Sequence, residues 1–235
     1  MPSPTESTPA VNTNLSELQT IDSLIYSHKW FIDDLQDTYD LSYSFINKNS
    51  VFDDFNYDSE TNSNILWSSL DEFNLVQKTA LRNVISEWSQ VSGITFMEVE
   101  ESETTVGDIR LGLSSEVQSL VGDATGFAYL PGNFYPSSGD IWFNSNANDL
   151  FGGFVTSTFE NSEFKPGSLA YYTALHEFGH ALGLKHPFET LPEAKSVLSS
   201  NLDEISNTIM SYTYVANDSS VFGLNIYPST PMSYD

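Results

Sequence analysis

One stretch, from His176 to His186, constrains this chain more than any other, because it holds three of the four histidines in the sequence. The residues run His-Glu-Phe-Gly-His-Ala-Leu-Gly-Leu-Lys-His. Residues four apart lie on one face of a helix, so His176 and His180 can direct their imidazoles at one metal ion. Gly183 can adopt a left-handed conformation and end the helix, which lets the chain turn and present His186 as a third ligand. Three protein ligands and one open position predict a catalytic zinc site, because a structural zinc site fills all four positions with side chains.

Glu177 adds the acid–base group that such a site needs. It follows the first ligand directly, so its carboxylate can reach a water at the metal without binding the metal itself. A lone H-E-x-x-H could equally be a pair of ordinary helix histidines. The longer pattern H-E-x-x-H-x-x-G-x-x-H matches here at every fixed position, which favours the metal site. His28 stands far from this pattern and is expected to be a surface or packing residue, because the motif already supplies three ligands.

The composition predicts one well-packed domain with an acidic surface. Of the 235 residues, 40% are apolar and 14% aromatic, which is sufficient for a core. Eight Lys and Arg stand against 32 Asp and Glu, a formal net charge of −24. Such a surface repels nucleic acid and anionic lipid and attracts cations, including calcium. The sequence has no cysteine, so disulfides and thiolate ligands are excluded.

The N-terminal residues do not resemble an export signal. Residues 1–20 are rich in Pro, Ser, Thr and Asn, and they predict a flexible tail or a short pro-segment. The first seven residues have neither a basic start nor an apolar run, which argues against a secretory signal peptide. No apolar stretch is long enough for a transmembrane helix, so membrane insertion is not expected. Residues 21–235 are expected to form one domain, which acts as a monomer.

Periodicity predicts two long helices and a series of strands. Apolar residues recur at helical spacing over 71–91, with a possible capping box from Ser69 to Glu72 and a stop at Gly93. Ser168 is a plausible N-cap for a second helix, which carries the histidines. The acidic residues between 98 and 103 are expected to be a solvated loop. Residues 144–153 are rich in Asn and Gly and could bind calcium, although a plain loop fits their spacing better. Predicted strands cover 41–46, 94–99, 108–113, 126–131 and 139–144.

Taken together, the zinc motif, the order of elements and the later triplet Met210-Ser211-Tyr212 resemble the metzincin clan of zinc peptidases, and within it the serralysin family. The resemblance spans roughly residues 24–235. It implies an α/β (α+β) fold of the metzincin type, with a twisted mixed sheet, two long helices and a small irregular C-terminal subdomain. The upper subdomain would extend to about residue 184 and the lower one over 185–235.

The resemblance also implies roles for single residues. His176, His180 and His186 would be ligands of one catalytic Zn²⁺, and Glu177 would be the general base that takes a proton from the zinc-activated water. Tyr212 would bind zinc in the free enzyme and hydrogen-bond the oxyanion during catalysis. Two further features belong to the site: Met210 in the Met-turn beneath the metal, and a substrate-binding edge strand of Gly126, Phe127, Ala128, Tyr129 and Leu130.

A second triplet, Met232-Ser233-Tyr234, repeats the pattern near the C-terminus. Met210 is the better match to the Met-turn, because it lies closer to His186 and follows the compact turn Asn207-Thr208-Ile209. Family members continue beyond Met232 into a helix and a calcium-binding β-roll, whereas this sequence stops at Asp235 before either.

The resulting hypothesis is a secreted, zinc-dependent endopeptidase that hydrolyses peptide bonds of extended protein substrates. The alternative is a catalytically silent zinc- or calcium-binding module derived from a metzincin.

Overall fold

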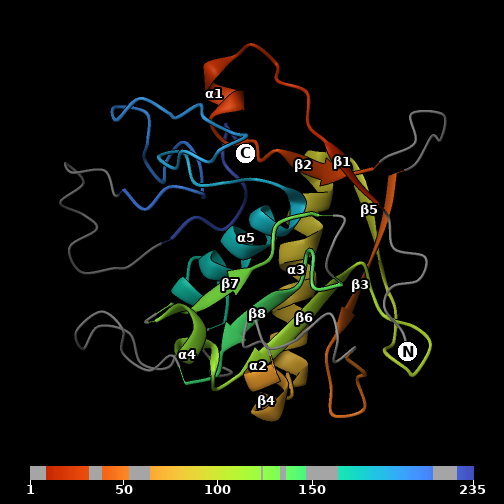
Figure 1. Cartoon of the computed structure of the whole chain (residues 1–235). Coiled ribbons are helices and arrows are strands. Elements are labelled where there is room, and N and C mark those ends of the chain that lie inside the picture. Colours follow the sequence, from red (N-terminus) through yellow and green to blue (C-terminus); the bar gives the residue numbers. More distant parts are fainter. Residues whose placement is uncertain are drawn as a thin grey trace.

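A six-stranded sheet and two long helices form the part of the molecule that carries the histidine motif (Figure 1). The computed structural model describes residues 9–31, 39–52, 64–122, 124–132, 136–146, 164–213 and 227–235. The strands of the sheet are β3 (Tyr39–Phe45), β4 (Leu70–Asp71), β5 (Ile94–Glu98), β6 (Ile109–Ser114), β7 (Gly126–Ala128) and β8 (Ile141–Asn144). The helices are α1 (Gln19–Asp22), α2 (Asn64–Ser68), α3 (Leu75–Ser92), α4 (Val117–Val121) and α5 (Leu169–Leu182).

The sheet is mostly parallel and ends in one antiparallel edge strand. Its order is β5-β3-β6-β8-β7, and β4 pairs separately with β6. β3 runs parallel to β5 and β6, and β6 runs parallel to β8. β7 runs antiparallel to β8 and is the last strand of the order. All five predicted strands are therefore present, and the predicted α/β fold with a mixed sheet and two long helices is confirmed.

The two faces of the sheet bury different side chains, as the period of two along a strand requires. Phe143 of β8 belongs to the main core, which lies between the sheet and the long helices α3 and α5. Its neighbour Trp142 lies on the other face, in a smaller cluster with Ile46, Leu66 and Val117. Gly112, the register partner of Trp142, has no room for a larger side chain, because an added Cβ would lie 2.5 Å from the indole ring.

The helix α3 begins later than the sequence predicts. Its N-cap is Asn74, whose side chain accepts from the Gln77 backbone while the Gln77 side chain accepts from Asn74. The capping box predicted at Ser69 and Glu72 is therefore wrong. The reason lies outside the local sequence: residues 70–71 are extended in β4, held by pairing with β6. The predicted stop at Gly93 is confirmed, with a left-handed φ of 71°.

Part of the predicted flexible tail is paired with the rest of the chain. β1 (Ala10–Asn12) runs antiparallel to β2 (His28–Trp30), and Ala10 is buried. Trp30 donates its indole N–H to the Ala181 carbonyl of α5 at 2.8 Å. A short antiparallel ribbon thus connects residues from position 10 onward to the helix that carries the histidines. None of the described helices is long and apolar enough to cross a membrane.

The acidic stretch before β6 contributes Glu101 to a buried ion pair with Arg110. Glu101 was expected in a solvated loop, yet its side chain and that of Arg110 are 0% and 1% exposed. The Arg110 guanidinium donates to both carboxylate oxygens, at 2.8 and 2.7 Å, and the Ser44 hydroxyl donates to one of them at 2.8 Å. Burial alone would raise the pKa of Glu101. The hydrogen bonds and charge of Arg110, with hydrogen bonds from Ser50 and Ser44, hold that pKa below its ordinary value.

Replacing Glu101 with Gln should lower the free energy of unfolding by about 3–5 kcal/mol, because it leaves the Arg110 charge buried without a partner. The exposed pair of Arg82 and Glu98 offers a matched control, and Glu98→Gln should cost at most about 1 kcal/mol. Since the folded pKa of Glu101 is lowered, its stabilisation is present above the ordinary value of 4.5 and disappears as pH falls through the folded pKa. Denaturant titrations between neutral and acidic pH measure both effects, and equal losses in the two variants would contradict the prediction.

Candidate metal centre

The helix that carries the histidines is fixed at both ends by the residues that the sequence predicts. Ser168 caps the start of α5, where its hydroxyl accepts from the Tyr171 backbone N–H at 3.2 Å. Gly183 ends the helix in a left-handed conformation, with φ of 105°. An added Cβ at Gly183 would also lie 2.9 Å from the His28 carbonyl, so glycine is required there for two reasons. Along its length α5 is buried on nearly all sides, as expected for a helix that is apolar all round.

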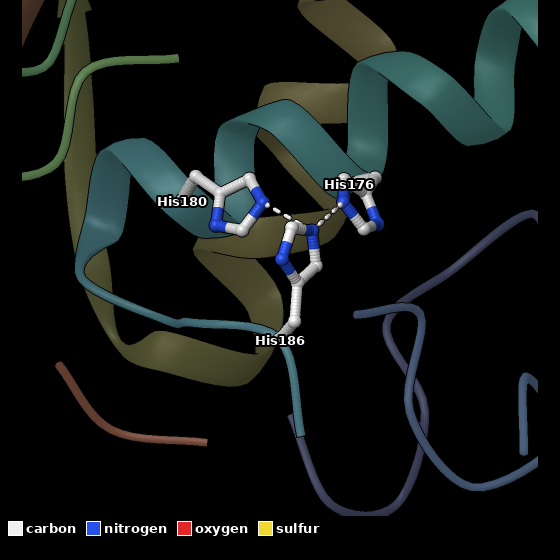
Figure 2. A group of neighbouring side chains, drawn as sticks. All are labelled: His176, His180 and His186. Carbon is white, nitrogen blue, oxygen red and sulfur yellow. Dashed lines mark hydrogen bonds between the residues drawn. The ribbon is translucent and has the colours of Figure 1, made fainter. Parts of the chain in front are cut away.

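Three imidazoles converge at the end of this helix. His176 and His180 project from one side of α5 toward His186, which comes from the segment after the helix (Figure 2). The Nε2 atom of His186 lies 3.2 Å from Nε2 of His176 and 3.1 Å from Nε2 of His180. The candidate ligand atoms all lie within 4.8 Å of one another. His28 is not part of this group and lies in β2, with its ring beside Tyr26.

The outer nitrogens of the two helix histidines face carbonyl oxygens. Nδ1 of His176 lies 2.7 Å from the Ile209 oxygen, and Nδ1 of His180 lies 2.7 Å from the Leu184 oxygen. A carbonyl can only accept, so Nδ1 must carry the hydrogen in both rings, and each Nε2 presents a lone pair to the cluster. Lone pairs that face each other repel, and a cation between them removes the repulsion. The donor set therefore fits a divalent metal that prefers imidazole nitrogen, such as zinc.

The protonation state of the rings suits the same role. Burial, together with repulsion from His186, lowers the pKa of His180 to about 4. Burial and the nearby Lys185 charge lower the pKa of His186 to about 4. Burial lowers the pKa of His176 well below its usual value. All three rings are therefore neutral at neutral pH, which is the form in which histidine binds a metal.

Met210 lies against the helix between the two ligands that α5 provides. It is fully buried, and an added Cβ on Gly179 would lie 2.7 Å from its sulfur and 3.1 Å from the Trp88 ring. Just before it, the Ile209 carbonyl accepts from both His176 and the Tyr172 hydroxyl, at 2.7 and 3.0 Å. The turn that contains Met210 thus contacts α5 through packing and through hydrogen bonds.

Asp235 holds the same turn from the other side, a role that the sequence pattern does not reveal. Its carboxylate accepts from the backbone N–H of Ile209 at 2.9 Å and of Met232 at 2.8 Å, and also from the Thr208 hydroxyl. Met232, from the second Met-Ser-Tyr triplet, is partly buried against the main core. The second triplet therefore contributes to a loop that supports the Met210 turn.

Glu177 is buried beside the edge of the sheet. It is 7% exposed, and burial raises its pKa to about 8. An added Cβ on Gly126 would lie 3.4 Å from the Glu177 Cγ, so β7 passes directly over this side chain. The strand pairing continues past β7, because Tyr129 exchanges backbone hydrogen bonds with Asp140 and Gly139 at 2.9 and 3.0 Å. The predicted edge strand and Glu177 are therefore neighbours.

Two aromatic residues cover the exposed side of the histidines. The Tyr212 hydroxyl lies 2.7 Å from Nε2 of His186, and its ring stacks on His176 with centroids 5.3 Å apart. Burial of that hydroxyl raises the pKa of Tyr212, and the charges of Glu177 and Glu189 raise it further, so the phenol stays protonated. Phe188, which the sequence pattern did not single out, stacks on His186 with centroids 5.1 Å apart and planes within 4°.

The calcium candidate over residues 144–153 lies largely outside the described residues, which end at position 146 in that stretch. In the described residues after α5, the chain forms turns and two isolated bridges, Leu184 with Ile25 and Leu191 with Ala194, without a named helix or strand. This part of the prediction, an irregular C-terminal region, is confirmed for the residues described.

Comparison with known proteins agrees with this geometry. Residues 60–218 match the matrixin family of peptidases, Peptidase_M10, and the chain belongs to this family. A serralysin of Photorhabdus sp. (strain Az29) is 30% identical over 211 residues, which cover 86% of this chain and 38% of that protein. Serralysin C of Dickeya chrysanthemi is 32% identical over 120 residues, or 50% of this chain and 22% of that protein.

The metallopeptidase AprA of Pseudomonas marginalis is 28% identical over 204 residues, which cover 83% of this chain and 38% of that protein. The chain thus spans at most 38% of the length of these relatives. The family and the relatives together support a metalloprotease.

Replacing Gly179 with Ala should destabilise the protein by about 1–3 kcal/mol, because the new methyl group collides with Met210 and Trp88. Glycine to alanine inside a helix otherwise stabilises by about 1 kcal/mol, so the sign of the effect identifies the collision. Denaturant titration of the metal-free protein measures this change in the free energy of unfolding. The double variant Gly179→Ala, Met210→Ala should lose less than the sum of the single losses, whereas strict additivity would show that the two residues do not contact each other.

Proposed function

We propose that the chain is a zinc-dependent endopeptidase that hydrolyses peptide bonds in extended protein substrates. The observation that carries the proposal is the convergence of three Nε2 atoms, two with their tautomer fixed by backbone carbonyls, next to a buried glutamate. His176, His180 and His186 would hold the ion. Zinc in such a site lowers the pKa of a coordinated water and polarises the scissile carbonyl.

Glu177 would act as the general base and acid. It follows His176 directly on α5, and burial raises its pKa, so the carboxylate accepts a proton more readily than an exposed glutamate would. In this role the carboxylate takes the proton of the attacking water and delivers it to the amide nitrogen as the peptide bond breaks. The amine then leaves as a neutral group. This exchange requires no other titratable residue.

Tyr212 would stabilise the negative charge that develops on the former carbonyl oxygen. Its hydroxyl lies 2.7 Å from Nε2 of His186, and its raised pKa keeps it a hydrogen-bond donor. The residue is 58% exposed, so the phenol can exchange its His186 contact for a contact with substrate. A donor placed where charge develops lowers the barrier directly.

Residues 126–130 would bind the substrate backbone as an added strand. β7 is the last strand in the order of the sheet, and an extended peptide can pair with such an edge through main-chain hydrogen bonds. Gly126 places this edge against Glu177, so a bound peptide would pass the catalytic residues. Backbone pairing makes limited demands on side chains, which favours broad specificity.

The proposal also includes the arrangement of the chain around the site. An upper subdomain up to about residue 184 would carry the sheet and two ligands, and a lower one over 185–235 would carry His186, Met210 and Tyr212. The expected setting is extracellular, with the protein acting as a monomer on protein or peptide substrates.

Replacing Glu177 with Gln should lower kcat/KM for casein cleavage by about 10²–10⁴-fold, the usual contribution of a general base. Zinc content should stay at that of the unmodified protein, because the side chain is not a ligand. Glu193→Gln, in the exposed part of the following loop, is the matched control and should leave cleavage unchanged. Unchanged turnover in Glu177→Gln would refute its role. A zinc-loaded but inactive parent protein would instead favour the silent metal-binding module.

Replacing Tyr212 with Phe should lower kcat by about 10²–10³-fold while KM and zinc content change little, because the lost hydrogen bond forms mainly in the transition state. Steady-state kinetics on a fluorogenic peptide, with metal analysis of the same samples, measure these quantities. Tyr26→Phe, on the segment before β2, removes a hydroxyl outside the cluster and should have no effect. A rise in KM with unchanged kcat would show that Tyr212 only binds substrate.

A further inference from the structure

Lys185 is a buried charge immediately before the third histidine. Its side chain is 0% exposed, among the largest fully buried side chains of the described residues. Lysine is almost never fully buried unless it is paired, because removing an ammonium from water is costly. It occupies one of the variable positions of the histidine motif, so the motif itself does not explain it.

Backbone carbonyls take the place of water around the ammonium. Nζ donates to the Ser23 oxygen at 2.6 Å and to the Glu189 and Ser196 oxygens at 2.8 Å each, one for each of its three N–H groups. A longer contact of 3.4 Å reaches the His186 oxygen. Within the part of the chain that the structure describes, no carboxylate forms an ion pair with it. The Ser23 carbonyl belongs to the N-terminal segment, and the Glu189 and Ser196 carbonyls belong to the loop after His186, so the ammonium joins these two segments.

The main chain at Lys185 adds a second connection to the N-terminal segment. Its N–H donates to the Leu24 carbonyl at 2.7 Å, and the Tyr26 N–H donates to the Gly183 carbonyl at 2.8 Å. Residues 23–26 therefore lie alongside the short stretch between the end of α5 and His186. Figure 1 shows α1, just before these residues, on the same side of the molecule as the C-terminal segments.

This arrangement matters because the third ligand is held less directly than the other two. His176 and His180 stand on a buried helix, and each has a carbonyl fixing Nδ1. His186 stands on an irregular segment, and its Nδ1 faces the Glu189 carboxylate at 3.4 Å. The Glu189 backbone is in turn held by Lys185. The position of His186 and the position of the group that faces its outer nitrogen both depend on the same ammonium.

We propose that Lys185 is a positioning residue for the metal centre: its buried ammonium gathers the Ser23, Glu189 and Ser196 carbonyls and thereby fixes the segment that presents His186. The inference rests on the proposed metal site and deepens it. It also gives the N-terminal segment a role, because residues 23–26 supply part of the structure that holds the third ligand.

The test compares Lys185→Met with Lys195→Met in the full chain. Lys195 is exposed in the same loop and serves as the matched control. The zinc dissociation constant, from competition with a chromophoric chelator, should rise 10–100-fold in Lys185→Met, the usual effect of losing a group that supports a ligand. The visible spectrum of the cobalt(II)-substituted protein should change, because the geometry at His186 changes. Lys195→Met should match the unmodified protein in both measurements.

A purely structural role would lower the unfolding midpoint of the metal-free protein without changing zinc affinity or the cobalt spectrum, and that result overturns the proposal. Lys185→Gln, which keeps an amide donor, is measured alongside in case the methionine variant does not fold. It should show an intermediate zinc affinity, and a value equal to that of the unmodified protein also overturns the proposal. Failure of the unmodified protein to bind zinc would refute the metal centre itself, which separates the two failures.

Discussion

The hydrogen bonds from histidine Nδ1 to backbone carbonyls are the interactions on which the candidate site depends. These carbonyls come from two different segments: Ile209 lies in the Met210 turn, and Leu184 lies just after the end of α5. Each bond selects the tautomer that leaves Nε2 free, and each fixes the plane of the ring. The Met210 turn therefore fixes the tautomer of His176 in addition to packing against the helix. This explains why the turn itself is held so firmly, by Tyr172 on one side and Asp235 on the other.

The helix α5 can present its histidines accurately because its neighbours also bond to it through polar groups. Trp88 of α3 donates its indole N–H to the Leu175 carbonyl at 3.1 Å, and Trp30 of β2 donates to the Ala181 carbonyl at 2.8 Å. Each indole adds a directional bond to a large buried contact area. A helix that was held by apolar contacts alone could rotate or slide slightly. The two indoles oppose such motion near both ligands that the helix carries.

The sequence was sufficient to predict those features of the fold and site that depend on neighbouring residues. The ends of α5 at Ser168 and Gly183, the five strands and the grouping of the three histidines all follow from spacing, capping and backbone freedom. The features that were predicted wrongly or missed depend instead on contacts with other parts of the fold. The start of α3 shifted because residues 70–71 pair with a distant strand, and Glu101 is buried because it bonds to Arg110 of β6 and to Ser44 of β3.

Asp235 and Lys185 likewise act on residues far away in sequence or on backbone atoms. Nearly every residue type has the same backbone carbonyl and N–H groups, so the residue type does not show which of them will form such a bond. Sequence alone therefore gives no indication of which lysine will be surrounded by carbonyls, or which aspartate will bind a turn.

The protein compensates its buried charges in two different ways. Arg110 is paired with the carboxylate of Glu101. Beside His186, Lys185 is surrounded by neutral carbonyls instead. The dipoles of these carbonyls stabilise the ammonium without a direct ion pair. The Glu189 backbone oxygen accepts from the ammonium, while its carboxylate is left to face Nδ1 of His186 at 3.4 Å. One residue of the loop therefore serves both the lysine and the third histidine.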